Sequence, residues 1–202
     1  MAYIIVNILY SYVDRNIELP MSNISSQDQI NITKYKQIVD RNNHYISYQM
    51  KQLFANGDTI YLNEWGKPLC DSIFFNVSHD GSLVVGSTHI YPIGIDCIDL
   101  QRRVSLESIS SVFCEPEIPS LKLFCKKEAV VKMIGQGLSF DLKRIRISNN
   151  KVYIDGKLIK KYKMLETKFN DHFIAVCSSF DSNDVKLKLS EYKYCDYIKT
   201  GL

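Results

Sequence analysis

The sequence predicts a mixed α+β protein with two similar halves. Its first segment is rich in Ile, Val and Tyr, which is typical of a buried β-strand. Four short β-like stretches follow in the middle of the chain, with Gly, Pro or Asp at their joints. A helical pattern followed by strands then recurs in the second half. This order predicts halves at residues 1–100 and 101–202, joined near Leu100 to Ser111 in one compact unit.

The first half is expected to begin with a strand at Ala2–Tyr10 and a polar helix from about Ser26 to Val39. A second helix is expected within Asn42–Gly57, because aromatic and apolar residues recur there at helical spacing and Gly57 can cap its end. Strand-like patterns bounded by turn residues then predict strands in Thr59–Leu69, Ile73–His79, Ser82–Ile90 and Pro92–Ile98.

The second half is expected to hold helices at Ser105–Phe113 and from about Ser120 to Ile134. The dipeptide Asn149-Asn150 tolerates positive φ and predicts a hairpin turn. The lysine-rich tail beyond Asp181 is expected to lie at the surface. Strands are expected in Leu142–Asp155, Lys161–Phe169 and His172–Phe180.

The composition predicts an ordinary globular protein. Of the 202 residues, 46% are hydrophobic and 23% are charged, which excludes a disordered chain. The net charge of +3 is compatible with an acidic ligand but too small to indicate a nucleic-acid-binding protein. No apolar run approaches the ~20 residues that a membrane-spanning helix needs, so no membrane association is expected.

The N-terminus and the cysteines predict a cytoplasmic protein. The stretch Met1–Arg15 lacks the positive segment and the small-residue cleavage site of a signal peptide. The six cysteines are scattered, with no Cys-x-x-Cys pair and no His/Cys spacing for zinc. We expect reduced and mostly buried thiols, without disulfides or zinc.

Several polar residues could carry chemistry, although each also has a structural interpretation. Asp96 follows an alternating apolar segment, where a carboxylate can bind Mg²⁺ or accept turn hydrogen bonds. Ser78 and His79 can hydrogen-bond a phosphate, or can be structural. Glu128 and Lys132 lie four residues apart on one helix face, which fits either an active site or an exposed ion pair.

The same helix carries two further local signals. Gly135 can serve as its C-cap. Lys127, considered by itself, is expected to be solvated.

Four short motifs, taken in order, resemble a known enzyme family. They are "GKP" at Gly66–Pro68, "FNVSHDG" at Phe75–Gly81, "GID" at Gly94–Asp96 and "KKEAVVKMIGQGL" at Lys126–Leu138. This succession resembles the 4′-phosphopantetheinyl transferases, specifically the larger, pseudo-dimeric type that activates surfactin synthetase. The matched region covers roughly a third of the chain. The resemblance implies a pseudo-dimeric transferase fold of two similar α/β halves, with the active site at their interface.

The resemblance also implies an activity. Such an enzyme transfers the phosphopantetheine arm of coenzyme A to a serine of an apo acyl or peptidyl carrier protein and releases adenosine 3′,5′-bisphosphate. It implies Mg²⁺, with Mn²⁺ as a substitute, and a monomer whose partners are the carrier protein and coenzyme A. Phosphoryl transfer of this kind depends on positioning and charge neutralisation.

The resemblance assigns the metal and the chemistry to three residues. Asp96 would be a direct metal ligand. Glu128 would be the second ligand, or the base that accepts the serine proton directly or through water. Lys132 would face the same phosphates and offset charge on the leaving group.

Other matched residues would bind the coenzyme. Lys67 and His79 would hold its 3′-phosphate or pyrophosphate, Ser78 its adenosine end, and Lys127 would touch the nucleotide side. Gly135 and Gly137 would let the backbone turn tightly beside the site. An upstream helix is matched loosely, with Arg41, Lys34 and Lys36 as phosphate contacts.

The chain departs from the family pattern at several positions. Phe124 and Cys125 replace the family's tryptophan and its Ser/Thr, and Asp80 adds a negative charge beside the phosphate site. Ile98 stands where many members have a third metal-binding glutamate. Asp99 should not replace it, because adjacent strand residues point to opposite faces.

Two other functions compete with this interpretation. A non-catalytic module could bind coenzyme A or a carrier protein without turnover. A metal-dependent nuclease could use Asp96 with Glu166-Thr167-Lys168, although the sequence shows no basic groove.

Overall fold

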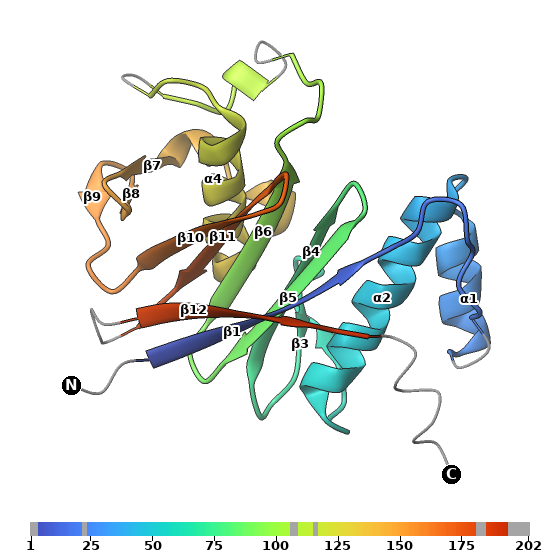
Figure 1. The fold of residues 1–202 in the computed structure, drawn as a ribbon. Helices are drawn as coiled ribbons and strands as arrows, with labels where there is room; N and C mark the ends of the chain where they lie inside the picture. The colour runs from blue at the N-terminus through green and yellow to red at the C-terminus, as the bar shows by residue number, and fades with distance from the viewer. Residues whose placement is uncertain (1–3, 22–23, 106–108, 115–116, 181–184, 194–202) are drawn as a thin grey trace.

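The computed structural model describes residues 4–21, 24–105, 109–114, 117–180 and 185–193. Within them, a few helices pack on several sheets, which confirms the predicted mixed α+β class (Figure 1). The similarity of the two halves stays a prediction. The helix expected at Ser105–Phe113 includes residues 106–108, which lie outside the described residues.

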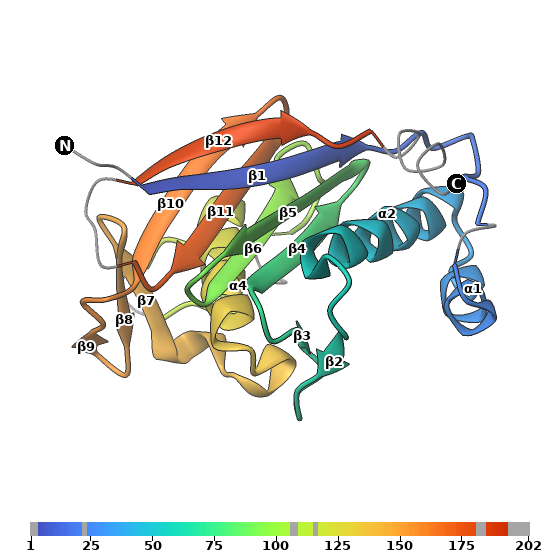
Figure 2. The same ribbon diagram turned by 90° about the horizontal axis from the view of Figure 1, so that it is seen from below.

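The larger sheet has the strand order β12-β1-β5-β4. Strand β1 pairs antiparallel with β5 and parallel with β12, so segments from opposite ends of the chain lie side by side (Figures 1 and 2). Its strands are β1 (Ile4–Tyr12), β4 (Phe74–Asp80), β5 (Leu83–His89) and β12 (Val185–Glu191).

Strand β12 corrects the expectation that the tail beyond Asp181 lies only at the surface. Lys186 and Lys188 are exposed, whereas Leu187 and Leu189 pack against the core cluster between the sheets. In the segment "VKLKL", apolar residues alternate with lysines, which is the pattern of a half-buried strand. Lysines on an edge strand also discourage pairing with another chain.

The second sheet has the order β10-β11-β6, and both of its pairings are antiparallel. It comprises β6 (Ile93–Asp99), β10 (Lys163–Phe169) and β11 (His172–Ser178). The boundary predicted near residue 100 falls directly after β6, so this sheet contains strands from both sides of it. The boundary itself stays a prediction.

Two small sheets complete the strands. One pairs β2 (Tyr61–Leu62) with β3 (Pro68–Leu69). The predicted hairpin turn is confirmed, because Asn149 and Asn150 have φ values of 50° and 58°. That turn joins two strands of the other small sheet, which holds β7 (Ile145–Ser148), β8 (Lys151–Ile154) and β9 (Lys157–Leu158).

The helix expected from Ser26 to Val39 is too long. Helix α1 (Ser26–Thr33) ends early, and Val39 belongs to α2 (Ile38–Ala55), which covers β4 and β5 (Figure 2). Helix α2 ends at Asn56, whose φ of 46° is left-handed, rather than at the expected Gly57.

Arg41 explains the break between α1 and α2. Its Nη1 donates at 2.9 Å to the carbonyl oxygens of both Tyr35 and Lys36, so these carbonyls need no helical partner. Its Nε lies 2.6 Å from Glu18 Oε1. The phosphate contacts expected of Arg41, Lys34 and Lys36 stay predictions.

Helix α4 (Leu121–Ile134) begins and ends where the sequence predicts. The Ser120 hydroxyl caps its start by accepting a 3.2 Å hydrogen bond from the amide of Leu123. Gly135 ends it with a left-handed φ of 84°, and its amide donates to the Val131 carbonyl at 2.8 Å. Two 3-10 turns follow at Gly137–Ser139 and Leu142–Arg144.

Gly94 lets α4 touch the second sheet through its backbone. Helix α4 packs on β6 and β11. A Cβ atom at Gly94 would lie 2.2 Å from the Ala129 carbonyl oxygen and 2.3 Å from the Met133 nitrogen. Glycine is therefore required at this crossing, which sets the position of α4 along β6. Among the described residues, no helix is long and apolar enough to cross a bilayer.

Gly94→Ala should destabilise the fold more than a matched glycine substitution. The new methyl collides with α4 backbone that cannot rotate away, so we expect a loss of at least about 3 kcal/mol, the upper range for overpacking. The control is Gly156→Ala, which has nothing within 4 Å and a positive φ of 76°, and should cost about 1–2 kcal/mol. Urea unfolding followed by circular dichroism measures both, and equal losses would contradict the packing argument.

Candidate functional site

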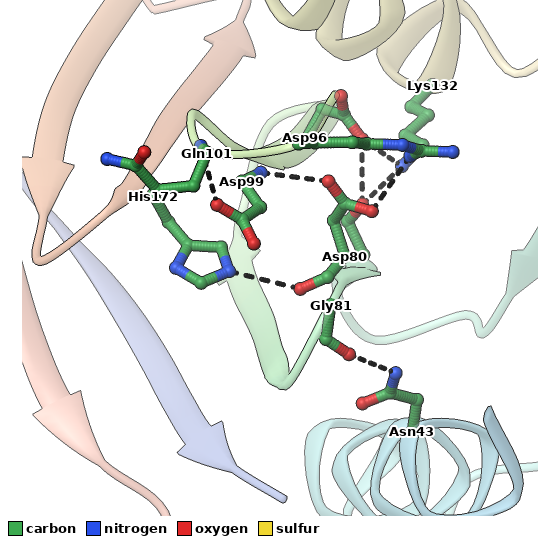
Figure 3. Close-up of polar contacts among 10 residues, drawn as sticks. Asn43, Asp80, Gly81, Asp96, Asp99, Gln101, Lys132 and His172 are labelled. Atoms are coloured by element: carbon green, nitrogen blue, oxygen red, sulfur yellow. Dashed lines mark hydrogen bonds and ion pairs between the residues drawn. The ribbon is translucent and has the colours of Figure 1, made fainter. Parts of the chain in front are cut away.

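A serine, an aspartate and a lysine from three elements meet at one point. Ser78 lies on β4. Asp96 lies on β6 and Lys132 on α4, and Figure 3 shows these two side chains together. The Lys132 Nζ lies 2.6 Å from Asp96 Oδ1 and donates to Ser78 Oγ at 2.7 Å. The Ser78 hydroxyl in turn donates to Asp96 Oδ1 at 2.7 Å. We call these three residues the polar triangle.

The polar triangle lies where the two sheets separate. Strands β4 and β6 are edges of different sheets, so backbone N–H groups of β6 that face β4 need other partners. Asn76 Oδ1 accepts from the Ile95 amide at 2.9 Å, and Asp80 Oδ2 accepts from the Asp99 amide at 2.8 Å. Asn76, Ser78 and Asp80 are alternate residues of β4 and share one face. This polar seam holds the two strands together.

Lys132 is charged and accessible. Burial alone would lower the pKa of Lys132, but the charge of Asp96 and its hydrogen bond outweigh burial, so the pKa is raised. Its side chain keeps 28% of its surface exposed. A ligand can therefore reach a lysine that carries a full positive charge.

Glu128 lies one helical turn before Lys132. Burial raises the pKa of the Glu128 carboxyl, the negative charge of Asp96 raises it further, and Lys132 partly opposes both. Glu128 lines a cavity of about 270 Å³ whose other walls are Val112, Val131, Gly137, Phe140, Asp141 and Leu142. The carboxyl thus combines a raised proton affinity with an open approach.

Lys67 reaches the site from the β2–β3 connection. Its ammonium donates to the main-chain carbonyls of Ile93 at 3.3 Å and Met133 at 3.2 Å, and burial lowers its pKa to about 8. Lys67 and Lys132 line one cavity of about 190 Å³, with Gly135 at its edge. A Cβ at Gly135 would lie only 3.0 Å from Lys67 Cδ, so this turn leaves room for the lysine.

His79 points to the opposite face of β4 from Ser78, because they are adjacent strand residues, and it lines a cavity. This cavity, of about 590 Å³, lies beside the start of α2 and is also lined by Arg15 and Arg102. The His79 ring packs edge-on against His44, with centroids 4.9 Å apart. Burial, followed by the positive charge of Lys132, lowers the pKa of His79, so the ring is neutral at pH 7. The two arginines supply the positive charge there.

Lys127 corrects the expectation of a solvated side chain. Its side chain is fully buried, and its Nζ lies 2.6 Å from Glu117 Oε2. The ammonium also donates to the carbonyls of Val112 at 3.1 Å and Leu142 at 3.2 Å. The contact of Lys127 with a nucleotide stays a prediction, and it would require these protein contacts to open.

The residues that depart from the family pattern lie in different surroundings. The Asp80 carboxylate is 2.9 Å from Arg102 Nη1, which offsets its charge. Ile98 is 5% exposed and packs in the core cluster around α4. Asp99 lies on the opposite face of β6, near Gly81, as the alternation predicts. Cys125 is buried in the same core cluster as Ile98.

Part of the chain matches a known protein family. Residues 92–177 match the family model of the 4′-phosphopantetheinyl transferase superfamily. The chain is also 35% identical over 92 residues to the 4′-phosphopantetheinyl transferase psf-1 of Bacillus pumilus, covering 38% of this chain and 40% of the relative. It is 29% identical over 111 residues to the 4′-phosphopantetheinyl transferase ffp of Bacillus subtilis, which covers 47% of this chain and 48% of the relative. It is 30% identical over 144 residues to the 4′-phosphopantetheinyl transferase pptA of Paxillus involutus, which covers 52% of this chain and 55% of the relative.

The similarity is to 4′-phosphopantetheinyl transferases in general. The aligned part spans about half or less of the length of each relative. The family match contains Asp96, Glu128 and Lys132 but not Lys67 or the β4 residues. The tertiary structure joins these two groups in one place.

Two carboxylates of the site suit a hard divalent cation. Among the described residues, no group of three or more His, Cys, Asp and Glu is arranged to hold a metal. Asp96 and Glu128 are close enough for the first to raise the pKa of the second, and a cation between them would relieve this repulsion. The donor set therefore fits Mg²⁺ with only two protein ligands.

Sequence reasoning assigned no role to Asn76 or Arg102. Asn76 is found through its spacing, because it alternates with Ser78 and Asp80 along β4. Arg102 has no local signal, since its pairing with Asp80 depends on how β4 meets β6.

Asp96→Asn should lower the pKa of Glu128. The substitution removes a negative charge that raises this pKa, and it frees Lys132 to approach Glu128, which acts in the same direction. Because burial is the larger cause, the pKa should stay above the ordinary value for glutamate. Carboxyl NMR titration of the metal-free protein measures the change. An unchanged or higher value would mean that Asp96 and Glu128 do not interact.

Proposed function

We propose that the protein transfers the 4′-phosphopantetheine group of coenzyme A to a serine of an apo acyl or peptidyl carrier protein, as in the surfactin-synthetase-activating type. The observation that carries this proposal is the polar triangle beside Glu128. It brings Ser78 together with Asp96 and Lys132, which come from motifs far apart in the sequence.

The coenzyme phosphates are proposed to bind around Lys132. Its accessible ammonium neutralises charge that develops on the leaving phosphate. Lys67 opens on the same cavity as Lys132, and the cavity of His79 adds Arg15 and Arg102. The coenzyme carries three phosphate groups, and the two lysines of the first cavity offer cations to them. The cavity of His79 also holds Asp40 and Asp80 beside its two arginines, so its formal charges balance.

Glu128 is proposed to accept the proton of the carrier serine. The serine oxygen forms a bond to the β-phosphorus that carries pantetheine, and the bond from this phosphorus to the bridging oxygen breaks. Adenosine 3′,5′-bisphosphate leaves, and the serine proton moves to Glu128. In the metal-free protein the pKa of Glu128 is raised, so Glu128 is then a stronger base than an exposed glutamate.

Asp96 and Glu128 are proposed to hold Mg²⁺ or Mn²⁺. When bound, the cation supplies charge neutralisation at the pyrophosphate oxygens. With only two protein carboxylates, coenzyme pyrophosphate oxygens and waters would complete the shell, so cation and coenzyme should each strengthen the binding of the other.

The geometry gives no support to the nuclease alternative. Glu166 pairs with Ala175, which pairs with Asp96, so their backbones stand two strand spacings apart, roughly 10 Å. The Glu166 carboxylate forms an ion pair with Lys126, whereas Asp96 pairs with Lys132. The two carboxylates therefore have different partners.

Incubation of a panel of apo carrier proteins with coenzyme A, Mg²⁺ and this protein should add one phosphopantetheine to the carrier serine. Asp96→Ala and Glu128→Ala should nearly abolish transfer, and Lys132→Ala should slow it on the order of 10²–10³-fold. The control is Lys126→Ala, on the same helix but paired with Glu166. Intact-mass spectrometry measures the product.

Three outcomes of this experiment separate the alternatives. No mass gain together with no coenzyme binding would refute the transferase. Coenzyme or carrier binding without mass gain would establish the non-catalytic module. Equal rates for the Lys132 and Lys126 variants would show that Lys132 is only a surface lysine.

Coenzyme affinity should fall as the pH rises above about 8. The free protein loses the Lys67 charge near its pKa of about 8, so phosphate binding must then take up a proton, which weakens affinity by up to about tenfold per pH unit. Lys67→Arg should abolish this loss because guanidinium stays charged. Calorimetric titration at pH 7 and pH 9 tests this, and a pH dependence that persists in Lys67→Met would assign it to another group.

A further inference from the structure

The most deeply buried charged side chain of the described residues is Lys127, one position before Glu128. Its side chain has 0% exposure and that of Glu117 has 4%. Lysine is almost never fully buried unless it is paired. The proposed reaction assigns no chemistry to this pair.

The Lys127 ammonium connects three separate segments. It makes three polar contacts, with Glu117 Oε2 and the carbonyls of Val112 and Leu142, which matches its three N–H donors. It also lies 5.1 Å from the centroid of the Phe113 ring. One side chain of α4 thus holds the segment before the helix and the segment after it.

Glu117 extends these connections to another sheet. Its Oε1 accepts from the Ile147 amide of β7 at 3.3 Å, and its Oε2 accepts from the Cys114 amide at 3.2 Å. Burial opposes the charge of Glu117, but hydrogen bonds from Lys127 and Cys114 outweigh burial and lower its pKa. Glu117 is therefore ionised at neutral pH.

The groups held by Lys127 are walls of the cavity that Glu128 lines. Val112 and Leu142 both line this cavity, and both give their carbonyl oxygens to Lys127. Lys127 and Glu128 are adjacent on a helix and lie about 100° apart around its axis. Glu128 faces the cavity, and Lys127 holds two of its wall residues through their carbonyl groups.

We propose that the Lys127–Glu117 ion pair is a positioning device that sets the shape of the cavity through which the acceptor serine approaches Glu128. This inference rests on the proposed transferase function. Both residues act through Val112 and Leu142, not through contact with substrate. Stability alone does not account for the pair, because replacing a buried ion pair by apolar residues is often neutral or stabilising.

The test is the double variant Lys127→Met/Glu117→Leu, which removes both charges and so leaves no buried ion without its counter-ion. It should fold with a Tm near that of the wild type, while kcat falls by about tenfold or more and the KM for coenzyme A changes by less than about twofold. The control is Lys126→Met, which removes the neighbouring ion pair with Glu166 and should leave kcat and KM unchanged.

A second readout does not depend on activity. The Cys114 thiol contacts Glu117 Oε2 at 3.4 Å, and the other described cysteines are buried. In the double variant, Cys114 should react faster with iodoacetamide, and the Cys114 and Ile147 amides should exchange hydrogen faster. If the double variant does not fold, Glu117→Gln, which keeps the shape of the side chain, takes its place with the same expected results.

Wild-type kcat together with wild-type Cys114 reactivity in a folded variant would overturn the proposal. Equal losses of kcat in the Lys126 and Lys127 variants would also overturn it, because the effect would then belong to the whole helix. Failure of the wild-type protein to modify any carrier would instead refute the proposed function, so the two failures are distinguishable.

Discussion

The ion pair between Lys132 and Asp96 joins α4 to β6 at the point where the two sheets separate. It forms because Gly94 lets the helix backbone rest directly on the strand two residues before Asp96. A side chain at that position would push the helix outward and move the Lys132 ammonium from the carboxylate. The polar triangle, the placement of Glu128 and the two cavities beside α4 all follow from this close crossing.

The electrostatics of the site favour a bound cation or a bound proton. Asp96 and Glu128 together carry two negative charges against one positive charge on Lys132. Burial raises the pKa of Glu128, and the negative charge of Asp96 raises it further. Burial lowers the pKa of Lys67 to about 8, so the charge of Lys67 changes with pH close to that value.

Three lysines of α4 have different surroundings although they share one helix. Lys126 pairs with Glu166, Lys127 is buried against Glu117, and Lys132 joins the polar triangle. The rotation of about 100° per residue explains how neighbours meet different environments. The same helix therefore contributes an exposed contact, a structural brace and a ligand-accessible charge.

The sequence by itself determined what depends on neighbouring residues. The limits of α4, the left-handed Gly135 and the hairpin at Asn149-Asn150 follow from capping and turn chemistry within a few positions. The ordered motifs also predicted candidate site residues. The structure brings Ser78, Asp96 and Lys132 into contact, whereas Lys127 pairs with Glu117 and His79 lines a separate cavity.

Only the tertiary structure decided what depends on residues far apart in the chain. Residues Val185–Glu191 form β12 because their alternating apolar and polar side chains suit pairing with β1. Lys127 is buried because Glu117 and two carbonyl groups surround its ammonium. The polar seam has the same origin, since Asn76 and Asp80 gain their partners only when β4 meets β6. Local patterns fix backbone conformation, whereas burial and charge pairing depend on packing between distant segments, which local propensity does not encode.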